Sequence, residues 1–206
     1  MQTARLILLT RLKFSVLVQA LTLLIATSTA GFASDFNTGL RAFRAGDYPL
    51  AFNIWHPLAR AGQANAQHAI GAMYEYGHGL VRDDAEALIW YGKAAAQDMA
   101  DSQYRLGVLT ENGWGVPRDP VAAAKWYSLA AEAGHVLAQH DLAFLYYEGK
   151  GVPQNVVQAY KWLKIASAIR ADLMAKHLAY VSEDLDATQK ATGDLLANAW
   201  FQAHQP

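Results

Sequence analysis

Histidine is the residue type in this chain best suited to metal binding or acid–base catalysis, and its spacing decides which of these the sequence supports. The chain has seven histidines, and His135 and His140 are the two nearest to each other in sequence. Five residues apart on a helix, they point in different directions. No H-x-x-x-H or H-E-x-x-H pair occurs, so a helical zinc site has no support. Cysteine is absent, which removes disulfides, thiolate ligands and a cysteine nucleophile.

Carboxylates and glycines give no catalytic pattern either. Asp83 and Asp84 are adjacent, as are Glu183 and Asp184, and neighbours on a helix do not face each other. Their positions at expected helix starts favour a capping role. The glycines of "GHGLVRDD" lack the spacing and the Lys-Ser/Thr of a phosphate-binding loop, and no G-x-S-x-G motif occurs. We therefore predict that the protein is not an enzyme and has no catalytic residues, no cofactor and no metal site.

Composition points to a folded domain without affinity for nucleic acid. The chain has 206 residues, 53% of them hydrophobic, and a formal net charge of −1. This hydrophobic content is enough for a sizeable core. Three basic residues lie in the first thirty-three residues, so the remainder has 14 basic and 18 acidic residues and a charge of −4. A mildly acidic domain lacks the basic surface that binds nucleic acid.

The first thirty-three residues have the layout of a secretory signal peptide. Arg5, Arg11 and Lys13 precede the apolar run "FSVLVQALTLLIA", and small residues follow in "TSTAGFAS". We place cleavage after Ala33, with Ala30 as the second choice. The run is short for a membrane span, which takes roughly 20 apolar residues, and an uncleaved anchor is the alternative. The prediction is export, to the periplasm of a bacterium, without stable membrane insertion once the signal is cleaved; secretion or N-terminal anchoring are the alternatives.

One stretch of the sequence occurs three times at a constant interval. "GHGLVRDDAEALIWYGKAA" at residues 77–95 is followed 36 residues later by "GWGVPRDPVAAAKWYSLAA" and after the same interval by "GKGVPQNVVQAYKWLKIAS". A fixed period of this length is typical of a helical repeat array. Each copy begins with glycines that end a helix, and the next helix begins at an N-cap: Asp83, Asp119 or Asn155. Glu86 and Gln158 lie three residues after such a cap, as in a capping box.

The second helix of each copy alternates large and small apolar residues. In the first copy these are Ala87, Trp90, Tyr91, Ala94 and Ala95. Such alternation lets neighbouring helices approach closely. The tryptophan at this register is expected to be a buried packing anchor, with a ligand-stacking platform as the alternative.

The recurring pattern resembles the Sel1-like repeat, a relative of the tetratricopeptide repeat (TPR). The consensus A-x-x-x-L-G-x-x-Y-x-x-G-x-G-V, then D, then A-x-x-W-Y-x-x-A-A is matched in the first copy by Ala66, Ile70, Gly71, Tyr74, Gly77, Gly79, Asp83, Ala87, Trp90, Tyr91, Ala94 and Ala95. The later copies depart from it at Thr110, Ala143 and Leu163. The resemblance implies an all-α, right-handed α-solenoid of stacked helix–turn–helix units.

The flanks complete a six-part division of the chain. We predict a signal peptide at 1–33, an N-terminal TPR-like helical hairpin at 34–64, three Sel1-like repeats at 65–100, 101–136 and 137–172, and atypical C-terminal capping helices at 173–206. Ser182 is expected to be the N-cap of the last helix. A solenoid needs an atypical unit to cover its apolar end, and a partner-binding arm is the alternative role for this tail.

The first helices of such an array line its concave groove, which the resemblance implies is the binding face. The resemblance places twelve side chains there: Arg41, Arg44, Asn65, His68, Glu75, Tyr76, Asp101, Tyr104, Glu111, His140, Phe144 and Tyr147. Aromatic, His and Arg side chains of this kind are common at interfaces. For Tyr76 and Phe144, packing between hairpins is an equal alternative.

We therefore predict an adaptor that binds a protein or peptide in this groove. Sel1-like proteins are implied by the resemblance to act in assembly and signalling, including signalling in the bacterial envelope. A cell-envelope module that binds a glycan or other ligand is the alternative, and a hydrolase is a further one.

Overall fold

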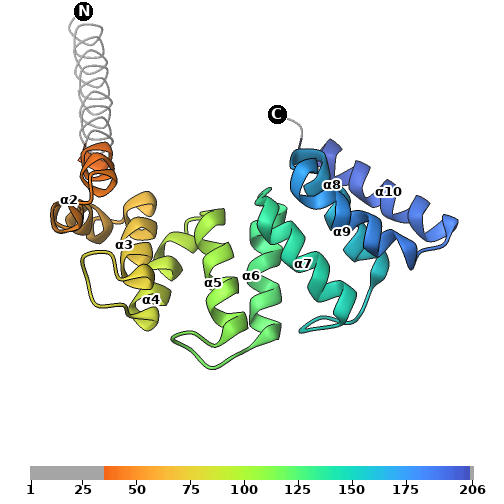
Figure 1. The fold of residues 1–206 in the computed structure, drawn as a ribbon, viewed down its shortest axis with the longest axis horizontal. Helices are drawn as coiled ribbons and strands as arrows, with labels where there is room; N and C mark the ends of the chain where they lie inside the picture. The colour runs from red at the N-terminus through yellow and green to blue at the C-terminus, as the bar shows by residue number, and fades with distance from the viewer. Residues whose placement is uncertain (1–34, 205–206) are drawn as a thin grey trace, which may run out of the picture.

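The computed structural model describes residues 35–204, and every regular element in that range is a helix. Residues 35–44 are helical and precede nine labelled helices that follow one another along an arc (Figure 1). The expectations for residues 1–33 lie outside the described residues. The labelled helices are α2 (Tyr48–Arg60), α3 (Ala64–Tyr76), α4 (Asp84–Ala95), α5 (Ala100–Asn112), α6 (Pro120–Glu132), α7 (Val136–Glu148), α8 (Val156–Ile169), α9 (Ala171–Glu183) and α10 (Ala187–Ala203).

Each repeat has the helix-ending glycine and the N-cap residue that the sequence predicts, without the reciprocal side-chain bond of a capping box at Glu86 or Gln158. Helix α3 ends at Gly77, whose φ of 67° lies in the left-handed region that glycine adopts without strain. The Asp83 carboxylate then accepts hydrogen bonds from the backbone N–H groups of Ala85 and Glu86 at the start of α4, which confirms it as the N-cap. Asp119 and Asn155 cap α6 and α8 in the same way. The fold prediction of an all-α solenoid is confirmed.

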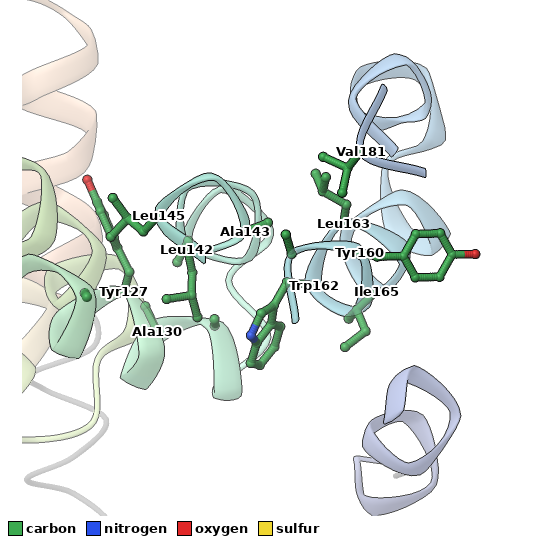
Figure 2. Packing of buried hydrophobic residues seen from close by; sticks show 14 of the residues in the cluster. Tyr127, Ala130, Leu142, Ala143, Leu145, Tyr160, Trp162, Leu163, Ile165 and Val181 are labelled. Atoms are coloured by element: carbon green, nitrogen blue, oxygen red, sulfur yellow. The ribbon is translucent and has the colours of Figure 1, made fainter. Parts of the chain in front are cut away.

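From α2 to α9 each helix packs on its neighbours in the chain, and α10 packs back on α8, so buried clusters follow one another along the array. Figure 2 shows one part of this core, where side chains from α6, α7 and α8 meet. Trp90 and Trp162 are buried at 7% and 3% exposure, as expected for packing anchors, whereas Trp126 of the second repeat is only partly buried. The small residues beside them, such as Ala87 and Ala159, are fully buried.

The two helices of a repeat pack so closely that one position of the first helix has no room for a side chain. In the second repeat, a Cβ atom added to Gly107 would lie 2.5 Å from the ring of Tyr127. Gly71 and Tyr91 have the same relation in the first repeat. The third repeat has Ala143 with Leu163, so both partners change together.

Two helices cover the C-terminal end of the array, and both pack on α8. Helix α9 contributes the buried Val181 to the core of the last repeat, and Trp200 of α10 donates a hydrogen bond from its indole N–H to Glu132 of α6. The expected N-cap at Ser182 is wrong. Ser182 lies inside α9, where its hydroxyl donates to the Ala179 carbonyl, and Asp186 caps α10 in a capping box with Gln189.

The close contact at Gly107 yields a stability prediction. Gly107→Ala is expected to destabilise the protein by about 1–3 kcal/mol, because the added methyl group overpacks the helix contact. Adding Tyr127→Leu, which copies the pairing in the third repeat, is expected to recover part of this loss. Chemical denaturation of both single variants and the double variant measures the coupling.

Gly92→Ala is the matched control, because Gly92 is also in a helix but nothing lies within 4 Å of its added Cβ. It is expected to stabilise the protein by about 0.5–1 kcal/mol through helix propensity. Strictly additive effects of Gly107→Ala and Tyr127→Leu would refute the steric explanation.

Candidate functional site

Side chains of α3, α5 and the start of α7 contact one another from repeat to repeat, and the surface of these first helices is here called the first-helix face. It contains two hollows. The N-terminal hollow has a volume of about 380 Å³ and is lined in part by Phe36, Phe43, Asn65, His68 and Ala72. The second hollow, here called the acidic pocket, has a volume of about 280 Å³ and is lined in part by Tyr104, Glu111, Tyr127, His140, Asp141 and Phe144. Half of the twelve predicted residues line these hollows: Asn65, His68, Tyr104, Glu111, His140 and Phe144.

His68 lines the N-terminal hollow and is half-buried. Its Nδ1 atom is 2.8 Å from the hydroxyl of Ser102, and its ring lies 5.2 Å from that of Tyr91. Burial lowers the pKa of His68, and this outweighs the opposing effect of Asp101. The side chain is therefore a neutral hydrogen-bonding group at neutral pH.

Tyr104 contacts the next repeat through His135. The two rings stack with their centroids 4.4 Å apart. His135 is the N-cap of α7, and its Nδ1 accepts the N–H of Ala138, so Nε2 carries the proton and faces Asp101 at 3.4 Å. Burial lowers the pKa of His135. Tyr104 and Asp101 of the predicted set are therefore held by His135, and one face of the tyrosine ring is already covered.

Glu75, which we expected to contact a partner, is buried at 4% exposure. Its carboxylate accepts a 2.7 Å hydrogen bond from the hydroxyl of Tyr91 and is paired with the guanidinium of Arg105. Arg105 also lies 5.6 Å from the ring centroid of Tyr76. Glu75 is therefore a structural group, whereas Tyr76 is 56% exposed beside it.

The C-terminal helices reach part of the predicted set in the third repeat. The Tyr147 hydroxyl donates a 2.5 Å hydrogen bond to Asp184, which follows α9. His140 is 2.8 Å from Asp141 and 3.0 Å from His177 of α9. The ring of Phe144 lies 4.9 Å from His140. Helix α9 therefore contacts two residues of the acidic pocket's lining, His140 and Phe144, through His177.

The two predicted arginines lie apart from the hollows. Arg41 and Arg44 are exposed on the helical residues 35–44, and Arg41 donates a hydrogen bond to Thr38. Neither arginine is among the residues that line the two hollows.

Sequence reasoning missed Arg105, Asp141 and His177. Arg105 and Asp141 are 36 residues apart and occupy the same register in consecutive repeats. The change from a basic to an acidic residue at the same repeat position was the signal that could have identified them. His177 lies beyond the periodic region, so no register marks it.

The fold and this face together define a class: a helical-repeat protein with a hollowed surface along its first helices. Within residues 35–204, no three His, Asp or Glu side chains are grouped so that they could hold a metal ion. The family model of the Sel1 repeat matches residues 64–99, 100–135 and 136–168, which together make up just over half of the chain. The protein belongs to the Sel1 repeat family, whose members are typically protein–protein interaction modules.

Solved structures agree with this assignment. The chain is similar to a Sel1 repeat protein from Oxalobacter formigenes, with a TM-score of 0.70 and 26% identity over 82% of this chain and 70% of that one. It also shares its fold with a protective antigen present in uropathogenic Escherichia coli strains, with a TM-score of 0.59 and 23% identity over 83% of this chain and 45% of that one. No curated protein sequence matches the chain.

The buried carboxylate of Glu75 yields a comparison between two repeats. Glu75→Leu is expected to cost about 2–3 kcal/mol of stability, because it strands both the Tyr91 hydroxyl and the Arg105 guanidinium. Glu111→Leu at the same register is expected to cost only about 1 kcal/mol, because Glu111 accepts from Tyr127 and has no arginine partner. Equal losses of stability in the two variants, measured by denaturation, would contradict this assignment.

The lowered pKa of His135 predicts a pH dependence. Because the unfolded chain binds a proton more readily than the folded one, stability is expected to fall as the pH drops below about 6.5. His135→Asn keeps a capping side chain for α7 without the titrating group. Thermal unfolding between about pH 7.5 and 5 should show a smaller loss of stability in His135→Asn, and an unchanged loss would exclude His135 as a source.

Proposed function

We propose that this protein is an exported adaptor that binds a protein or peptide on its first-helix face. The observation that carries the proposal is the pair of hollows on that face, lined by aromatic, His and carboxylate side chains from successive repeats. An extended or helical peptide laid along the array would reach both hollows. Aromatic side chains are enriched at interfaces and among the residues that carry most of the binding energy.

The family gives this reading its general support, since Sel1 repeats typically mediate protein–protein interactions. A role in envelope assembly or signalling is the setting that the family resemblance suggests. Export rests on the signal-like residues 1–33, outside the described part of the chain. Within residues 35–204, no helix is long and apolar enough to cross a bilayer.

A capture experiment tests the proposal. The purified protein is immobilised, envelope extract is passed over it, and bound proteins are identified. The variant Tyr76→Ala/Phe144→Ala removes two aromatic side chains of the first-helix face, one exposed and one half-buried. We expect a specific partner to bind the parent protein at least tenfold more tightly than this variant, as for loss of two interface anchors.

The matched control is Val121→Ser/Leu129→Ser, since both residues are 51% exposed on α6 and line a separate surface hollow. This variant should retain the partner, and circular dichroism checks that both variants fold. A partner lost only from the control would move the binding site to α6. Retention of purified cell wall without any bound protein would favour the glycan alternative instead.

A further inference from the structure

Asp141 of the acidic pocket has an arginine, Arg105, as its counterpart in the preceding repeat. Arg105 of α5 and Asp141 of α7 are equivalent residues in consecutive repeats, 36 positions apart. Arg105 is paired with Glu75, and Asp141 lines the same pocket as Glu111, which lies 36 positions after Glu75. The protein thus contains two versions of one site, which differ in whether the chain supplies the cation.

In the first version, the guanidinium of Arg105 is held on two sides. It is paired with the carboxylate of Glu75, with its Nε 3.0 Å from Oε2, and it lies 5.6 Å from the ring centroid of Tyr76. Tyr91 orients the same carboxylate through a 2.7 Å hydrogen bond. The site is therefore a carboxylate with an aromatic neighbour, already occupied by arginine.

The second version keeps the orienting tyrosine and lacks the arginine. Tyr127 donates a 2.8 Å hydrogen bond to one carboxylate oxygen of Glu111, whose side chain lines the pocket. Across residues 35–204, no Lys or Arg side chain forms an ion pair with the carboxylate of Glu111 or Asp141. Arg118 reaches only the backbone carbonyl of Glu111, to which its Nε donates at 2.9 Å. Glu148 at the rim is paired with Lys150 at 2.6 Å.

Two further groups fix Asp141 as an acceptor. His140 lies 2.8 Å from its Oδ1 atom. Burial, followed by the charge of Asp141 and a hydrogen bond to it, raises the pKa of the Tyr104 hydroxyl, which therefore stays protonated as a donor. The pocket thus has two oriented carboxylates, with the rings of Tyr104 and Phe144 in its lining.

We propose that the acidic pocket receives an arginine side chain of the bound protein or peptide, in the place that Arg105 occupies one repeat earlier. The inference rests on the proposed function and names the chemistry of the partner. A planar guanidinium suits this lining because it pairs with carboxylates through fixed N–H donors and stacks on aromatic rings, which an ammonium does less well. The volume of about 280 Å³ is below the roughly 300–1,000 Å³ of small-molecule sites, and it fits a single side chain.

The direct test titrates the purified protein with N-acetyl-arginine methylamide and follows backbone amide shifts by NMR. We expect saturable shifts at Glu111, Tyr127 and Asp141, weakened by high salt. N-acetyl-citrulline methylamide, which has the same shape without the charge, should produce no saturable shift. Citrulline that binds as well as arginine overturns the proposal, and lysine methylamide that binds equally well overturns the preference for a guanidinium.

Asp141→Arg is the decisive variant, because it rebuilds the occupied version of the site. Its guanidinium is expected to pair with Glu111 and to abolish binding of the arginine probe while the fold is retained. Glu111→Gln is the second variant, since its amide oxygen still accepts from Tyr127; it should weaken arginine binding about five- to tenfold. Unchanged arginine binding in both folded variants refutes the site.

The captured partner separates this inference from the proposed function. A partner that is lost from Tyr76→Ala/Phe144→Ala but binds Asp141→Arg as well as the parent supports the adaptor and refutes the arginine site. A partner that is lost from Asp141→Arg, and whose own arginine-to-citrulline peptide no longer binds, supports both. If the arginine probe binds at the pocket and no protein is captured, the pocket chemistry stands and the adaptor fails.

Discussion

The contact between a tyrosine ring and a glycine backbone within a repeat sets the geometry on which the rest of the structure depends. Tyr91 packs on Gly71 and Tyr127 on Gly107, at distances that leave no room for a Cβ atom. This approach brings the tyrosine hydroxyl to the carboxylate four residues further along the first helix, Glu75 or Glu111. A packing constraint in the core therefore fixes the position of a charge at the first-helix face.

Buried glutamines join the repeats with the same regularity. The side-chain amides of Gln67, Gln103 and Gln139 donate hydrogen bonds to the carbonyls of Ala59, Ala95 and Ala131, respectively. Each of these carbonyls belongs to the last turn of the preceding helix, where intrahelical partners run out. These carbonyls also accept backbone N–H groups of the following turn, so each glutamine adds a second donor that ties its helix to the preceding one. This contact explains a buried polar register that the apolar pattern alone does not account for.

The sequence predicted the elements of this fold because their signals are local. Gly77 ends one helix and Asp83 begins the next through interactions within a few residues. The start of α10 was misplaced because Ser182 and Asp186 are both good N-caps, and only packing decides between them: Val181 and Leu185 are both buried against the last repeat. Glu75 was misjudged for a similar reason, since its partner Arg105 comes from the next repeat and a helical pattern within one repeat does not reveal it.

Residues at the same position of successive repeats occupy equivalent places in the solenoid, but their neighbours differ. This difference decides which carboxylates are neutralised by a basic side chain and which are not. In the first repeat Glu75 has both a tyrosine and an arginine, so its charge is neutralised within the fold. In the third repeat Leu163 has no hydroxyl and Tyr147 replaces the glutamate, so the polar contact moves to Asp184 beside the capping helix. Only in the second repeat is the tyrosine–glutamate pair kept while the facing arginine is replaced by Asp141. The carboxylates without a basic partner, Glu111 and Asp141, therefore lie in the middle of the array. On one side the first repeat neutralises Glu75 with Arg105, and on the other Tyr147 is bonded to Asp184 beside the C-terminal cap.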